Sequence, residues 1–127
     1  MTDDEAAIAA VTKYYDAFNR ALKTMDPTEM TLLAGPACSV CEQAVENLRR
    51  DRASGRTYQG GASYPSEIKV VQRKDADHYL IAARVTTEAM EIRDGTGKVV
   101  DTFNAVSGPK SFVVARVKGI WTLDAVV

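Results

Sequence analysis

Apolar side chains near the N-terminus recur at alternating steps of three and four residues, which places them on one stripe of a helix. Acidic residues precede this stripe and basic residues follow it, so both ends suit the helix dipole. The pattern predicts an amphipathic helix over about residues 4–24. The stripe consists of Ile8, Val11, Tyr15, Phe18 and Leu22.

The segment "MDPTEMTLLAG" predicts a short second helix over about residues 27–34. Asp26 is the expected N-cap and Pro27 the first helical residue. Glu29 is positioned to reach back as in a capping box, and Gly35 is the expected stop.

The segment "SVCEQAVENLRRDRASG" predicts a third helix over about residues 39–54. Ser39 is the expected cap, with Glu42 three residues later, and Gly55 is the expected terminator. The inner stripe consists of Cys41, Ala44, Val45 and Leu48.

After "TYQGGASYPS" the apolar period changes from 3.6 to 2. The segments "EIKVVQRK", "HYLIAARVTTEAMEI", "KVVDTFNAV", "KSFVVARVK" and "IWTLDAVV" are rich in β-branched and aromatic residues and are separated by turn sequences. Helices followed by such a meander predict an α+β fold. We expect one domain, residues 1–127, with three N-terminal helices packed against a curved antiparallel sheet of four to six strands from about residue 66.

Size and charge limit the classes of function. A chain of 127 residues fits one core, and a net charge of −1 gives no basic surface for nucleic acid. No apolar run reaches the ~18 residues of a membrane span, and the acidic start is unlike a secretory signal. As written, the chain is expected to be soluble, with membrane contact only through an anchor outside it.

Cys38 and Cys41 form a C-x-x-C pair that leaves three interpretations open. A thiol at a helix N-terminus has a lowered pKa, which would make Cys38 a redox nucleophile, but no strand leads into the pair as it does in dithiol oxidoreductases. A zinc site needs two more ligands, and His78 is the one histidine, so we predict no metal. A structural disulfide would contribute about 2 kcal/mol for so short a loop; in a reducing compartment the pair would be buried thiols.

Aromatic residues and one carboxylate give a candidate pocket, although ordinary core packing explains several of them equally well. We identify no catalytic set and no cofactor site, since His78 flanks a turn where it is expected to face solvent. The candidate pocket residues are Tyr14, Tyr15, Phe18, Tyr58, Tyr64, Trp121 and Asp124.

The order of elements resembles the nuclear transport factor 2-like superfamily, also called the cystatin-like cone fold. The resemblance is carried by the opening "AAIAAVTKYYDAFNRALKTMDPTEMTLLAG" and the terminal aromatic Trp121. Within it, "TMDPTEMTLLAGPACSVCEQAVENLRRDRASGRTYQGG" resembles an actinobacterial lipoprotein-type family of domains of unknown function. That resemblance implies an upstream lipobox cysteine, a place outside the cytoplasmic membrane and an oxidised Cys38–Cys41 pair.

These observations favour a non-enzymatic domain that binds a small molecule or a protein, as the extracytoplasmic part of a lipoprotein. One alternative is a small cone-fold enzyme, an isomerase or cyclase acting on an apolar substrate through Tyr14, Tyr58 and Asp124. Another is thiol–disulfide exchange by Cys38 and Cys41. The resemblance also implies that a homodimer could form through the exposed sheet face.

Overall fold

The computed structural model describes all residues from 1 to 127, and three helices make up its N-terminal part. They are α1 (Asp3–Thr24), α2 (Thr28–Leu32) and α3 (Ser39–Ala53). Thr2 caps α1 in a capping box with Glu5, and Met25 ends the helix in a left-handed conformation. No helix is both long and apolar enough to cross a membrane.

The most buried face of α1 is built largely from alanines and lies beside the predicted stripe. Tyr15 and Phe18 are only half-buried, whereas Tyr14 is 5% exposed. Small side chains let the helix approach the sheet closely, so the larger aromatic residues of the stripe lie toward the edge of the contact. The buried residues of α1 are Ala7, Ala10, Val11, Tyr14, Ala17, Ala21 and Leu22.

The predicted caps of the two shorter helices need correction. In α2 the N-cap position is held by Pro27 and not by Asp26, so the helix begins at Thr28. Asp26 accepts a hydrogen bond from the Thr28 amide at 3.0 Å, and Glu29 accepts one from Arg20 instead of closing a capping box. The cap of α3 is Cys38, whose Sγ accepts from the Cys41 amide at 3.2 Å, while Ser39 is already helical. The spacing in the sequence favoured the Ser39 hydroxyl as the cap, but in the structure the Cys38 sulfur occupies that position.

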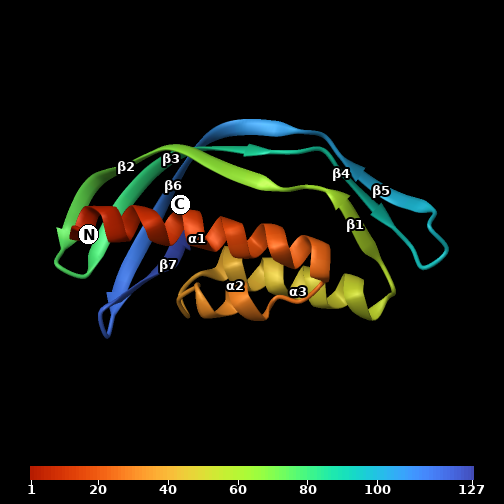
Figure 1. Ribbon diagram of the computed structural model, residues 1–127, viewed down its shortest axis with the longest axis horizontal. Helices are drawn as coiled ribbons and strands as arrows, with labels where there is room; N and C mark the ends of the chain where they lie inside the picture. The colour runs from red at the N-terminus through yellow and green to blue at the C-terminus, as the bar shows by residue number, and fades with distance from the viewer.

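Seven strands follow, and they form one arch that divides into two sheets (Figure 1). The four-stranded sheet has the order β2-β3-β6-β7, and the three-stranded sheet the order β1-β4-β5; all pairings are antiparallel. The strands are β1 (Thr57–Gly60), β2 (Ser63–Asp75), β3 (His78–Thr87), β4 (Met90–Arg93), β5 (Val99–Phe103), β6 (Val106–Val117) and β7 (Ile120–Val126).

The arch bends where the chain passes from one sheet to the other. This happens three times, between β1 and β2, between β3 and β4, and between β5 and β6. Gly60 has φ +76° and a Cβ there would lie 2.1 Å from the Ala89 carbonyl oxygen, so the bend requires glycine on two grounds. The strands therefore start at Thr57 rather than near residue 66. Gly60 and Gly61 thus lie at the bend between β1 of one sheet and β2 of the other.

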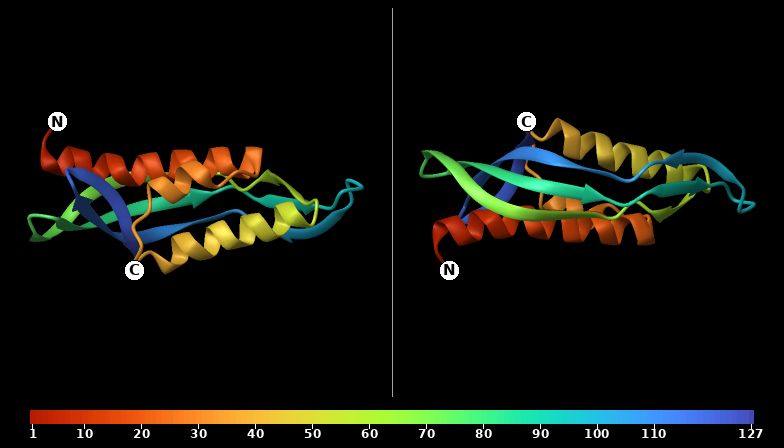
Figure 2. Two further views of the ribbon diagram at one scale, coloured as in Figure 1. Left: turned by 90° about the horizontal axis from the view of Figure 1, so that it is seen from below. Right: turned by 90° about the horizontal axis from the view of Figure 1, so that it is seen from above.

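All three helices lie under the concave face of the arch, and α1 and α3 run along opposite edges of the sheet, with strands visible between them (Figure 2). The core lies between them and the four-stranded sheet, and its largest fully buried side chains are Phe112, Met30, Ile81, Leu123, Val11 and Val114. The segment after α2 pairs with β7, since the Gly35 amide donates to the Leu123 carbonyl at 2.7 Å. This α+β arrangement of helices against a curved antiparallel sheet confirms the predicted fold class.

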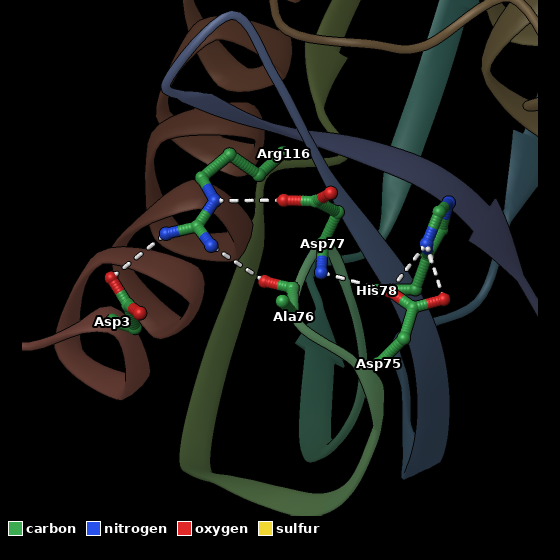
Figure 3. A network of polar contacts seen from close by, with 6 residues as sticks. All are labelled: Asp3, Asp75, Ala76, Asp77, His78 and Arg116. Atoms are coloured by element: carbon green, nitrogen blue, oxygen red, sulfur yellow. Dashed lines mark hydrogen bonds and ion pairs between the residues drawn. The ribbon is translucent and has the colours of Figure 1, made fainter.

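At one end of the arch, Arg116 joins three segments that are distant in sequence (Figure 3). Its guanidinium donates to Asp3 of α1 at 3.0 Å, and to the Asp77 carboxylate and the Ala76 carbonyl of the β2–β3 turn at 3.1 and 2.7 Å. It also lies 5.1 Å from the centre of the Trp121 ring. We call this region, residues 3–4, 73–79 and 116–121, the closed end.

Candidate functional site: a groove between α1 and α3

Two adjoining cavities lie between α1, α3 and the concave sheet face. The larger has a volume of about 410 Å³ and the smaller about 190 Å³. Phe18, Ala44 and Thr87 line both, so the cavities form one groove along the two helices. The larger cavity lies at the bend of the arch, where Phe103 and Val106 are 50% and 63% exposed. We call the bend and the β1-β4-β5 sheet the open end.

The groove wall formed by α1 is fixed to the sheet by Asn19. Its side-chain amide donates to the Ser63 carbonyl and accepts from the Ser63 amide, both at 2.8 Å. The Ser63 hydroxyl in turn lies 2.8 Å from the Thr87 hydroxyl. These polar groups satisfy one another at the start of β2, so they position the groove and leave its surface mainly apolar.

The two tyrosines of the smaller cavity remain neutral over the physiological range. Burial raises the pKa of Tyr14 to about 12, with a smaller contribution from the neighbouring Tyr15, and burial likewise raises the pKa of Tyr15 to about 12. Their rings meet edge to face, with centres 5.7 Å apart. At neutral pH both phenols can donate hydrogen bonds, but neither is suited to act as a base.

The structure brings some of the predicted pocket residues together and separates others. Tyr14, Tyr15 and Phe18 line the smaller cavity, and Phe18 and Tyr58 line the larger. Tyr64 does not line either cavity and is 54% exposed. Two residues of β7 also lie outside the groove.

Those two residues are Trp121 and Asp124. Trp121 stacks on Tyr79 at the closed end, with ring centres 4.7 Å apart. Asp124 lies beside Gly35, where a Cβ would be 2.7 Å from its Oδ1. Tyr14, Tyr58 and Asp124 therefore do not converge on one cavity, because β7 pairs with the segment after α2 instead of facing the groove.

Sequence reasoning missed most of the apolar lining of the larger cavity. These residues come from the later turns of α1 and α3 and from the bend, where strand periodicity breaks, so no periodic pattern pointed to them. The missed lining residues are Leu22, Leu48, Met90, Phe103 and Val106.

A buried carboxylate beside the groove was also missed. Asp51 of α3 is 6% exposed, accepts a hydrogen bond from the Tyr58 hydroxyl and lies 3.5 Å from Arg56. Burial and the Asp51 hydrogen bond raise the pKa of Tyr58. Asp51 lies one turn beyond Leu48 on α3. The inner face of this helix was predicted from apolar residues alone, so a charged residue on it was not expected to be buried.

Cys38 and Cys41 form a disulfide, and both residues are 2% exposed. Cys41 lines the groove, and both cysteines line a separate cavity of about 370 Å³ between α2 and α3. The bond therefore joins the α2–α3 connection to the first turn of α3. No group of three or more His, Cys, Asp or Glu residues is arranged to hold a metal ion.

His78 lies at the closed end, away from the groove, with its side chain 47% exposed. Its Nδ1 is 2.9 Å from the Asp75 carboxylate, which raises the pKa of His78 and lowers that of Asp75 (Figure 3). This arrangement stabilises a turn and supplies no base to the groove.

Comparison with solved structures identifies the architecture. The intermembrane space region of the chloroplast protein ARC6 superposes with a TM-score of 0.71 at 14% identity, covering 100% of this chain and 96% of that one. A Novosphingobium aromaticivorans protein provisionally assigned as a scytalone dehydratase gives 0.60 at 14% identity, covering 93% and 79%. A Nostoc punctiforme protein of unknown function with a cystatin-like fold gives 0.55 at 11%, covering 93% and 86%.

The chain has the nuclear transport factor 2-like, or cystatin-like, cone fold. Identities of this size show the fold alone. No protein-family model and no curated protein sequence matches the chain, so its place in an actinobacterial lipoprotein-type family stays a prediction.

Proposed function

We propose that this chain is a non-enzymatic binding domain whose groove between α1 and α3 takes an apolar small molecule. The observation that carries the proposal is the continuity of the two cavities over a surface that is mainly apolar. Pockets of several hundred Å³ with apolar walls and a few polar groups are typical of small-molecule sites. The exposed Phe103 and Val106 form an accessible edge of this surface.

Binding without chemical conversion fits the groove better than catalysis does. Its phenols are neutral and poor bases, His78 lies elsewhere, and Asp124 faces Gly35. Some proteins with this fold are provisionally assigned as enzymes, but a likeness at this level of identity transfers no residue roles. Thiol–disulfide exchange is disfavoured by the burial of both cysteines, because exchange requires an accessible sulfur.

Fluorescence of the neutral dye Nile red tests the groove directly. Ala44 lines both cavities, so Ala44→Phe should fill the point where they join and abolish most of the dye binding. Ala53→Phe on the exposed end of the same helix is the matched control and should bind as the wild type does. Equal binding by wild type and Ala44→Phe would show that the groove is not the site.

We also propose that the domain acts outside the cytoplasm, anchored to the membrane through a lipid on a preceding segment. The Cys38–Cys41 disulfide supports an oxidising compartment. Alkylating thiols in intact cells of the source organism, before lysis, and measuring the protein mass would test this. A protein that takes up two alkyl groups without prior reduction would contradict the proposal.

A further inference from the structure

The Tyr14 hydroxyl is an unused donor at the inner end of the groove. Tyr14 is 5% exposed and lines the smaller cavity, yet its hydroxyl makes no hydrogen bond to another protein group. The Tyr14 hydroxyl is not among the fully enclosed polar atoms that lack a partner, so it keeps accessible surface and can donate to a molecule in the cavity. The adjacent Tyr15 hydroxyl, which lines the same cavity, is unpaired as well. Two free phenols beside one cavity point to an acceptor atom on a ligand.

Charge differs between the two ends of the groove. Lys110 of β6 lines the smaller cavity, and it takes part in none of the ion pairs of the chain. The first turn of α3 lines the same cavity through Val40 and Cys41 and adds the positive end of a helix dipole. No acidic side chain lines this cavity. In the larger cavity the one charged lining residue is Glu88.

The apolar surface lies between these two charges. The larger cavity is lined by side chains such as Leu22, Leu48 and Met90, and it continues past Phe18 into the smaller cavity. A ligand lying along the groove would therefore meet hydrogen-bond donors and a cation at one end only. An acyl chain with an anionic head has the matching distribution of polarity.

We infer that the groove selects an elongated apolar molecule with a carboxylate head, oriented with the carboxylate toward Tyr14 and Lys110. This inference rests on the proposed function. The tail then extends along α1 toward Leu22 and the exposed edge at Phe103. Tyr14 and Tyr15 donate to the carboxylate, and Lys110 balances its charge. Glu88 at the far end disfavours the reverse orientation by repulsion.

The spacing of lining residues sets a length for the probe. Tyr14 and Leu22 are separated by eight helical residues, or about 12 Å at 1.5 Å each. An extended chain advances about 1.2 Å per bond, so about ten bonds cover this distance. Decanoate is therefore a suitable probe, with decanol and decylammonium as neutral and cationic probes of the same length.

Isothermal titration calorimetry of the full chain with the three probes, at low salt, tests the inference. Decanoate should bind at least about tenfold more tightly than decanol, because hydrogen bonds to an ionised group are stronger than neutral ones. Decylammonium should bind most weakly. Lys110→Gln should weaken decanoate binding by about three- to tenfold and decanol binding by much less, because only decanoate carries a charge for Lys110 to balance. Tyr14→Phe should also weaken decanoate binding by about three- to tenfold and decanol binding by a smaller factor, because its hydrogen bond to a neutral oxygen is weaker. Lys74→Gln near the end of β2, away from the groove, is the matched control for loss of a positive charge.

The outcomes separate the two proposals. Equal affinity for decanoate and decanol, or an unchanged affinity of Lys110→Gln for decanoate, would overturn the selection of a carboxylate while binding of apolar molecules stands. Tighter binding of decylammonium would show that Glu88 sets the preference instead. If no probe binds and Nile red does not bind either, the groove is not a small-molecule site and both proposals are wrong.

Discussion

The closed and open ends of the arch differ in how their aromatic side chains are covered. At the closed end, Trp121 is 8% exposed, stacked on Tyr79 and overlaid by Arg116. At the open end, Phe103 is 50% exposed on a strand of which every residue is exposed. Covering apolar surface stabilises the fold, and leaving it uncovered preserves a surface for binding. The two ends thus separate stability from the proposed function.

The largest contrast should come from removing one aromatic side chain at each end. Trp121→Ala should lower the free energy of unfolding by about 3–5 kcal/mol, because it leaves a cavity against Tyr79 and the core. Phe103→Ala should lower it by less than about 1 kcal/mol. Urea denaturation measures both. A similar loss for the two variants would mean that the open end also contributes to the core.

The bend between the two ends allows a sharper test with glycines. Gly60→Ala combines a positive φ with a Cβ 2.1 Å from the Ala89 oxygen, whereas Gly97→Ala has φ +87° and no neighbour within 4 Å. The positive φ alone costs about 1–2 kcal/mol, so Gly97→Ala gives that cost and Gly60→Ala should exceed it. Equal losses in urea denaturation would show that the bend tolerates a side chain, and that the close approach is not required.

The disulfide should have an intermediate effect. Replacing both cysteines by alanine should reduce stability by about 2 kcal/mol, the value expected for so short a loop. Because both sulfurs are buried, dithiothreitol should reduce the native protein slowly and the urea-unfolded protein rapidly. Alkylation at successive times, with mass spectrometry of the products, measures both reduction rates. Equally rapid reduction of the native and unfolded protein would contradict the buried arrangement.

The Arg116 network at the closed end should contribute less than the disulfide and should depend on salt. Arg116→Met keeps some contact with Trp121 and loses the hydrogen bonds to Asp3 and Asp77. Thermal unfolding should show a small decrease in Tm that shrinks in about 1 M NaCl, where exposed charges are screened within about 3 Å. A decrease that is independent of salt would show that packing on Trp121, and not charge, is what Arg116 supplies.

The smallest effect should be the pH dependence of the Asp75–His78 pair. Asp75 raises the pKa of His78 above its ordinary 6.5, so this contribution is complete below 6.5 and is lost as the pH rises through the raised value. The pKa of Asp75 is lowered from 3.8, so its contribution is present above 3.8 and is lost on acidification. Stability relative to His78→Gln should therefore be greater at about pH 5.5 than at about pH 8.5. Urea midpoints at the two pH values check the sign.

The sequence by itself determined the elements that depend on near neighbours. The three-and-four spacing indicated α1, Gly55 indicated the end of α3, and turn sequences separated β2 from β3 and β6 from β7. Periodicity and end signals act within a window of a few residues, so they can be recognised without knowledge of long-range contacts. The C-x-x-C spacing likewise permitted the disulfide that the structure contains.

Only the tertiary structure decided how distant segments meet. In the sequence, Asn19 is only a polar residue in the second half of an amphipathic helix. In the structure it bonds both the amide and the carbonyl of Ser63, which is 44 residues away. Asp124 alternates with core residues on β7, yet pairing with the segment after α2 turns it toward Gly35. The groove itself arises where α1, α3 and the bend converge, and such contacts are fixed by packing between elements rather than by the pattern within any one of them.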